Sequence, residues 1–264
     1  MADDSRLSAV IDDEGRLFGV VNVIDVLVIL LVFAMVAAGL ALVGLGGTET
    51  AETRYATIDL GTYPDYVAEQ ITDGDEWTPQ GGGGSLTVTN VFMAPAGEGE
   101  RRVTVRAAIN GTATDPEAGA ESPIQFAGEP LRFGRTLTIE TNEYVVEGTV
   151  TDIGQTEPLG VPATQTVTVE VAGISQARAE RLAVGVTEIM GETETATIVD
   201  VDAQPARAAN DTQLRDVTLA MELNVRVLED DTVLFRGEEL RLEDELLFEL
   251  GNIRVEGRVT DLGE

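Results

Sequence analysis

The stretch "VEGTVTDIG" at residues 146–154 returns as "VEGRVTDLG" at residues 255–263, 109 positions later. The similarity extends upstream, because residues 126–154 align without a gap to residues 235–263, with 14 identities in 29 positions. A spacing of about a hundred residues exceeds the 20–50 residues typical of solenoid repeats. The sequence therefore predicts two copies of one whole module.

Each copy predicts a mostly β module with one short helix. Alternating apolar and polar residues at 54–60 and 165–171 predict the first strand of each copy. The segments 65–72 and 176–184 follow as predicted helices, and further strands rich in Val, Thr and Ile end in a hairpin. We expect an α+β fold, mostly β, in which each module is a small barrel or a curled antiparallel sheet with a short helix.

The repeated phrase carries six residues that we interpret as structural. A glycine inside a strand indicates a bulge or a barrel corner where a side chain does not fit, and Asp-x-Gly at the end of a strand is ordinary turn chemistry. The six residues are Gly148, Asp152, Gly154, Gly257, Asp261 and Gly263.

Residues 26–47 form an uncharged apolar stretch of 22 residues. As a helix this stretch would be about 33 Å long, enough to cross a bilayer. A cleaved signal peptide usually has a basic front and a shorter apolar run. We therefore predict a single transmembrane anchor at residues 20–47, which contacts the lipid bilayer through residues 23–47.

The predicted anchor divides the chain. Arg6 and Arg16 precede it, so the positive-inside rule favours a cytoplasmic segment at 1–19 and a C-terminal body outside the cell membrane. Residues 48–154 and 165–264 are then the two modules, and residues 155–164 are a linker with two prolines.

Four polar residues have local interpretations. Asn22 and Asp25 stand at the entrance of the predicted anchor, where they fit an N-cap and a first-turn acid. The alternative is an intramembrane contact with a partner helix or an ion path. Asn110 and Asn210 begin Asn-x-Thr sequons, the acceptor pattern for glycosylation in an exported chain.

The charge of the chain indicates a salt-loving organism. The formal net charge is −30, from 47 acidic and 17 basic residues, and every basic residue is arginine. Molar salt screens such self-repulsion, because the Debye length falls to about 3 Å. An acidic tail would concentrate the charge in a block, whereas here it is spread along the chain. Without a basic stripe, nucleic acid is excluded as a partner.

Residue types that are absent exclude most catalytic chemistry. The chain has no histidine, cysteine or lysine, which rules out Ser-His-Asp and Cys-His systems, Schiff bases and ordinary zinc or haem ligation. Asp152 and Asp261 occupy equivalent positions, as the acids of two-fold aspartic proteases do, but we favour the turn interpretation. We expect no catalytic residue, no cofactor and no metal ligand.

Other polar or glycine-rich stretches also have structural interpretations. The acidic runs 229–231 and 243–245 lack the spacing of a calcium loop and indicate solvated surface. The glycine run at 81–84 indicates a flexible loop, because no helix signal follows it as a phosphate-binding loop requires. Trp77, the only tryptophan, is interpreted as a structural plug.

The start of the apolar stretch resembles a family of single-span membrane proteins of unknown function, DUF4330. The residues that carry the resemblance are Leu17, Phe18, Gly19, Asn22, Ile24 and Asp25, with later similarity in "AEQITDGDEW" (68–77) and "VEGTVTDI" (146–153). The resemblance implies an anchored protein with an outer part, and it brings no activity, cofactor or partner.

The functional expectation is a non-enzymatic one. We expect a structural or interaction protein of the cell envelope with a protein partner, whose tethering raises effective concentration near the membrane. A module that binds lipid, peptide or a cation is the near alternative. A hydrolase based on paired carboxylates is the distant one.

Overall fold

The computed structural model describes residues 16–17, 21–22, 50–113, 123–206 and 214–263. The predicted span at 26–47, Asp25 and Asn210 lie outside these residues. The chain divides into two compact units, Met1–Thr50 and Ala51–Glu264. In the first unit, β1 (Arg16–Leu17) pairs antiparallel with β2 (Val21–Asn22). Within the described part of the chain, no helix has the length and apolar character needed to cross a membrane.

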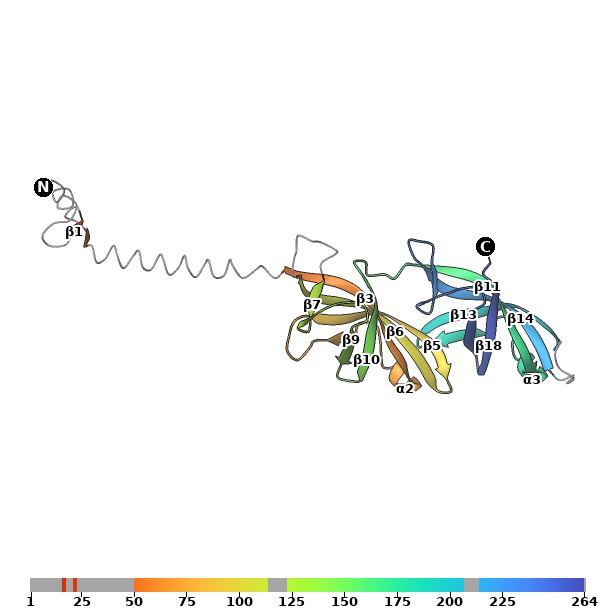
Figure 1. Cartoon of the computed structure of the whole chain (residues 1–264). Coiled ribbons are helices and arrows are strands. Elements are labelled where there is room, and N and C mark those ends of the chain that lie inside the picture. Colours follow the sequence, from red (N-terminus) through yellow and green to blue (C-terminus); the bar gives the residue numbers. More distant parts are fainter. Residues whose placement is uncertain (1–15, 18–20, 23–49, 114–122, 207–213, 264) are drawn as a thin grey trace. The chain divides into compact units, whose positions relative to one another are not determined.

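The second unit contains two curled antiparallel sheets with the same order of elements (Figure 1). The first module comprises β3 (Thr50–Pro64), α2 (Asp65–Ala68), β4 (Glu76–Trp77), β5 (Ser85–Gly97), β6 (Glu100–Ala113), β7 (Ile124–Phe126), β8 (Glu129–Pro130), β9 (Thr136–Glu140) and β10 (Val145–Gly154). The second comprises β11 (Val161–Ser175), α3 (Gln176–Ala179), β12 (Thr187–Met190), β13 (Thr193–Pro205), β14 (Leu214–Val227), β15 (Val233–Phe235), β16 (Glu238–Glu239), β17 (Glu245–Leu250) and β18 (Ile253–Asp261).

The two sheets have the same topology, strand for strand. The first follows the order β4-β5-β6-β3-β10-β9, and the second follows β12-β13-β14-β11-β18-β17. In each sheet a short strand, β7 or β15, branches from the long hairpin and pairs with β8 or β16. This match confirms the predicted repeat of a β module, and it defines equivalent residues by their pairing in the two sheets.

Each sheet curls around its own apolar core. The alternation along the strands turns one face inward, as in β10, where every second residue from Val146 to Val150 is buried. The two cores are separate clusters of Ile, Val, Leu and Phe side chains. Met190 of β12 is the exception, because it packs into the core of the first module.

The glycines of the repeated phrase lie where the sheet curves. A methyl group at Gly148 would come within 2.6 Å of both Leu60 and Ile58, and one at Gly257 would collide with Val169. The strand pairing shifts register between Val150 and Asp152, and it does so again at the equivalent place in β18. Glycine is therefore needed inside the strand, beside a bulge that bends the sheet.

The helices are shorter than the sequence predicts. α2 and α3 span four residues each, whereas residues 65–72 and 176–184 were expected to be helical. After α2 the backbone bonds close over three residues, from Gln70 N–H to the carbonyl of Val67. The chain then enters a turn in which the Asp75 carboxylate accepts the Thr72 N–H, so polar turn contacts replace a second helical turn.

β11 begins inside the segment expected to be a linker. Residues 161–164 pair with the end of β14 instead of forming a separate spacer. Pro162 lies where β11 is paired with β14 alone, because β18 pairs with β11 further along, at Thr168–Glu170. Proline in a sheet is confined to such edge positions.

Candidate functional site

The candidate site is the junction where the two modules meet inside the second unit. The β5–β6 hairpin of the first module supplies Phe92 and Arg101, and the second module supplies Gly237 and Glu249. Arg101 Nη1 lies 2.6 Å from Glu249 Oε2, and a methyl group on Gly237 would lie 3.1 Å from Phe92. The contact thus combines an ion pair with close packing of an aromatic ring on backbone.

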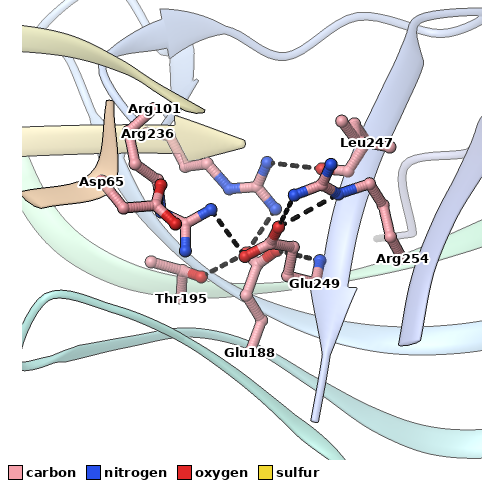
Figure 2. Close-up of polar contacts among 8 residues, drawn as sticks. All are labelled: Asp65, Arg101, Glu188, Thr195, Arg236, Leu247, Glu249 and Arg254. Atoms are coloured by element: carbon pink, nitrogen blue, oxygen red, sulfur yellow. Dashed lines mark hydrogen bonds and ion pairs between the residues drawn. The ribbon is translucent and has the colours of Figure 1, made fainter. Parts of the chain in front are cut away.

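Glu188 is the centre of a buried polar network at this junction (Figure 2). Its side chain is fully buried, with an exposed fraction of 0%. The carboxylate accepts hydrogen bonds from Arg236 and from the Thr195 hydroxyl, and it accepts the backbone N–H of Glu249 at 2.8 Å. A buried carboxylate is stable only with such partners, because desolvation of an unpaired charge costs several kcal/mol.

Arg236, the partner of Glu188, lies against two aromatic rings. Its guanidinium carbon lies 4.2 Å from the Phe235 ring centroid and 5.0 Å from that of Phe248, and its Nη1 donates to the Leu247 carbonyl at 2.9 Å. Burial lowers the pKa of Arg236, whereas the negative charge of Glu188 raises it. Contact with Glu188 and with the two rings thus offsets only part of the desolvation of the Arg236 guanidinium, and its pKa stays below the ordinary value.

Glu249 connects this network to the first module. It accepts hydrogen bonds from Arg254 of its own hairpin and forms the ion pair with Arg101. Arg101 also approaches Asp65 of α2, at 3.5 Å. An arginine of one module is thus shared between carboxylates of both, which fixes the orientation of the hairpin on β17.

A cleft of about 300 Å³ lies beside the network. Phe92, Met93 and Arg226 form part of its wall, and Arg226 stacks 5.8 Å from the centroid of the Phe92 ring. Asp73 stands at the same cleft, and burial raises the pKa of its carboxyl. A cleft of this size with apolar and charged walls has room for a small amphipathic ligand.

The two aspartates of the repeated phrase have different partners. Asp152 Oδ2 lies 2.8 Å from Nη1 of Arg106, a guanidinium that also donates to Thr57. Asp261 instead accepts the N–H of Gly263 at 2.7 Å in the closing turn. Each aspartate therefore serves its own module. Within the described residues, no group of three or more acidic side chains is arranged to hold a metal ion.

The remaining residues singled out in the sequence have local roles or stand apart. Gly154 leaves room for Arg106, whose Nη2 would lie 3.0 Å from a methyl group there. Asn110 is exposed on β6, opposite Ser85. Trp77 packs edge-on against Phe126 with ring centroids 5.6 Å apart. The backbone of Asn22 pairs with Arg16.

Sequence reasoning did not identify Glu188, Arg236, Arg101 or Glu249. One signal was available, because in "TEIM" of β12 the acid falls on the inward phase with Met190. An acidic side chain on the buried face of a strand predicts a partner that is also buried. The sequence does not show which arginine is the partner of Glu188, since most of the 17 arginines have equally polar neighbours in the sequence.

Comparisons with known proteins give one family match. No curated protein and no solved structure matches the chain. Residues 9–96, about a third of the chain, match the family model DUF4330, described as a domain of unknown function, and this match supports the family resemblance seen in the sequence.

Proposed function

We propose that this protein is a single-pass, outward-facing membrane protein of a salt-loving organism, and that its two modules form one scaffold that holds a protein partner in the cell envelope. The observation that carries the proposal is the junction between the modules. The ion pair of Arg101 with Glu249 joins elements from both copies, and the buried Glu188–Arg236 pair lies beside it within the second copy. Joined modules present their outer surfaces at a fixed spacing, which a partner can recognise with little loss of entropy.

The sequence supports the membrane and salt parts of the proposal. The uncharged 22-residue stretch is long enough for a bilayer, and Arg6 and Arg16 favour a cytoplasmic N-terminus. The net charge of −30 without lysine suits molar salt. Resistance of the protein to carbonate extraction, together with protease protection of an N-terminal but not a C-terminal tag, tests the anchor and its orientation.

Cross-linking in intact cells at native salt tests the scaffold. We expect a stoichiometric protein partner after purification of the tagged full-length chain. The R101A variant should recover less of this partner, because the modules lose a fixed orientation, whereas the exposed control R132A should recover as much as wild type. Recovery of the chain alone, or with a lipid or cation only, would contradict the scaffold.

A small-ligand carrier is the second candidate, favoured by the cleft of about 300 Å³. Native mass spectrometry of protein extracted at high salt tests it: a bound species lost in Phe92→Ala would support the carrier. A hydrolase is not proposed, since Asp152 pairs with Arg106 and Asp261 caps a turn.

A further inference from the structure

The cleft beside the junction holds a positive and a negative side chain that do not pair directly with each other. Arg226 of β14 and Asp73, in the turn before β4, both line this cleft. The charge of Arg226 lowers the pKa of Asp73, although burial raises this pKa overall. The two groups are therefore close enough to interact, but no ion pair of 4 Å or less joins them. A space remains between two opposite charges.

Arg226 is half-buried and yet has no acidic partner. Its guanidinium stacks on the ring of Phe92, and its Nη1 donates to the carbonyl of Gly160 at 3.5 Å, the outer limit of a hydrogen bond. Within the part of the chain that the structure describes, no carboxylate forms an ion pair with it. Because acidic residues far outnumber arginines in this chain, an arginine left without a carboxylate favours a ligand that supplies one.

The cleft also has an apolar wall. Met93 of β5 and Met190 of β12 belong to the core of the first module, and both border the cleft together with the buried Leu234 of β15. A second cleft of about 320 Å³ borders the same two methionines and Asp73. Methionine side chains adapt to groups of irregular shape. An apolar group can therefore be buried here, next to the two charged side chains.

The fold of the module does not require this combination of side chains. The other copy has different residues at the equivalent positions: Asp202 for Phe92, Thr112 for Arg226 and Val184 for Asp73. Phe92 is also used at the junction, where it packs on Gly237. Arg226 and Asp73 have no such second use among the described contacts, which favours a role in binding.

The charge of the chain favours a zwitterion over a simple anion as the ligand. A net charge of −30 repels free anions, and Asp73 would repel an anion inside the cleft as well. A zwitterion has no net charge, and its two ends match Arg226 and Asp73. In an α-amino acid the carboxylate, the ammonium and the side chain are all attached to one carbon. An apolar side chain then completes the match with the methionine wall.

We infer that the cleft binds a free α-amino acid with an apolar side chain. The carboxylate lies against Arg226, the ammonium lies against Asp73, and the side chain lies against Met93 and Met190. This inference rests on the small-ligand carrier, the second candidate above, and it names the class of ligand that such a carrier takes.

Isothermal titration calorimetry of the dialysed full-length protein with leucine, in detergent at molar salt, tests the inference. Ion pairs in a partly buried cleft are screened less than exposed ones, so leucine should bind to the wild type. Arg226→Gln and Asp73→Asn should each weaken leucine binding about tenfold. The exposed controls Arg132→Gln and Glu256→Gln change the net charge by the same amounts and should bind leucine as the wild type does.

Two analogues of leucine separate the two charges. Isocaproate lacks the ammonium group, and isoamylamine lacks the carboxylate. Arg226→Gln should weaken isocaproate but not isoamylamine, and Asp73→Asn should do the reverse. Loss of folding would weaken both analogues in both variants, so this crossed pattern identifies the charges themselves. Far-UV circular dichroism checks the fold, and Arg226→Lys, which keeps the charge, should retain more leucine binding than Arg226→Gln.

The outcomes distinguish this inference from the carrier on which it rests. Leucine that does not bind to the wild type would overturn the inference, as would leucine binding that both variants keep. Isocaproate that binds to the wild type as tightly as leucine would also overturn it. In each case a species that native mass spectrometry finds on the wild type, but not on Phe92→Ala, would still support the carrier. No bound species and no binding of any probe would contradict both.

Discussion

Glu188 in the second module occupies the position that Trp77 occupies in the first. Trp77 pairs with Leu86 on β5, and Glu188 pairs with Ala196 at the same place on β13. The indole packs on the ring of Phe126, whereas the carboxylate binds Arg236, whose guanidinium stacks on the equivalent Phe235. One copy thus fills this space with an aromatic ring and the other with an ion pair.

Removal of one partner of the ion pair should be costly. Glu188→Ala leaves Arg236 buried and unpaired, so we expect the free energy of unfolding to fall by about 3–5 kcal/mol. The combined variant E188W/R236A imitates the first module and should lose much less. Urea unfolding at molar salt, followed by far-UV circular dichroism, measures both. The exposed Glu256→Ala is the control, and an equal loss in the single and combined variants would contradict the interpretation.

We expect Arg101 to contribute more to the contact between the two modules than to the stability of the first module itself. Its side chain is 14% exposed and lies between Glu249 and Asp65, so Arg101→Ala should cost about 1–3 kcal/mol, between the values for surface and buried pairs. Amide hydrogen exchange should accelerate in β5 and β17. The same substitution at the exposed Arg132 should leave exchange unchanged. Faster exchange confined to β6 and α2 would assign Arg101 to its own module instead.

The two strand glycines should resist even a methyl group. Gly148→Ala would drive a carbon into Ile58 and Leu60, and Gly257→Ala would do the same at Val169. Overpacking of this kind costs about 1–3 kcal/mol. Thermal unfolding of each variant measures the loss. Gly81→Ala is a matched control, because among the described residues no atom lies within 4 Å of the added methyl; a similar loss there would indicate a general effect of glycine replacement.

The sequence predicted the repeat well because a duplicated phrase with strand alternation leaves few alternatives. The glycines at 148 and 257 could be assigned to sheet bends, since glycine inside a strand has few other uses. The junction could not be predicted. Its key positions differ between the copies, as with Phe92 and Asp202, and only the packed structure shows that one of them faces a neighbour.

The helices illustrate a second limit of the sequence pattern. Residues 69–72 continue the helical spacing after α2, but Asp75 accepts hydrogen bonds from the backbone and hydroxyl of Thr72 and holds a turn. Side chains that bond to nearby backbone compete with helix. Whether the helix or the turn forms depends on the strand that follows, and helix propensity does not take that strand into account.

Asp152 and Asp261 should differ in their effect on stability although they occupy equivalent positions. Asp152 neutralises Arg106, which is 2% exposed, so Asp152→Asn should lower the free energy of unfolding by about 1–3 kcal/mol. Asp261→Asn keeps an acceptor for the Gly263 N–H and should change it by less than about 0.5 kcal/mol. Each variant controls for the other in urea unfolding. Equal losses would mean that the Arg106 pair contributes nothing.

Tyr144 should make stability depend on alkaline pH. Burial and the hydrogen bond from its hydroxyl to Asp75, 2.5 Å long, raise the pKa of Tyr144 above its ordinary value of about 10. The folded chain therefore holds this proton more tightly than the unfolded chain does. The contribution is complete below pH about 10 and is lost progressively as the pH rises above that value.

The comparison of Tyr144→Phe with wild type isolates this effect. We expect the variant to be less stable by about 1–2 kcal/mol at pH 8, because a hydrogen bond to a carboxylate is lost, and the difference should shrink toward pH 11. The chain has no lysine, so tyrosines dominate titration in this range. Tyr66, 69% exposed, gives the control Tyr66→Phe, which should match wild type throughout. A difference between Tyr144→Phe and wild type that stays constant from pH 8 to pH 11 would show that the phenol titrates alike in the folded and unfolded chains.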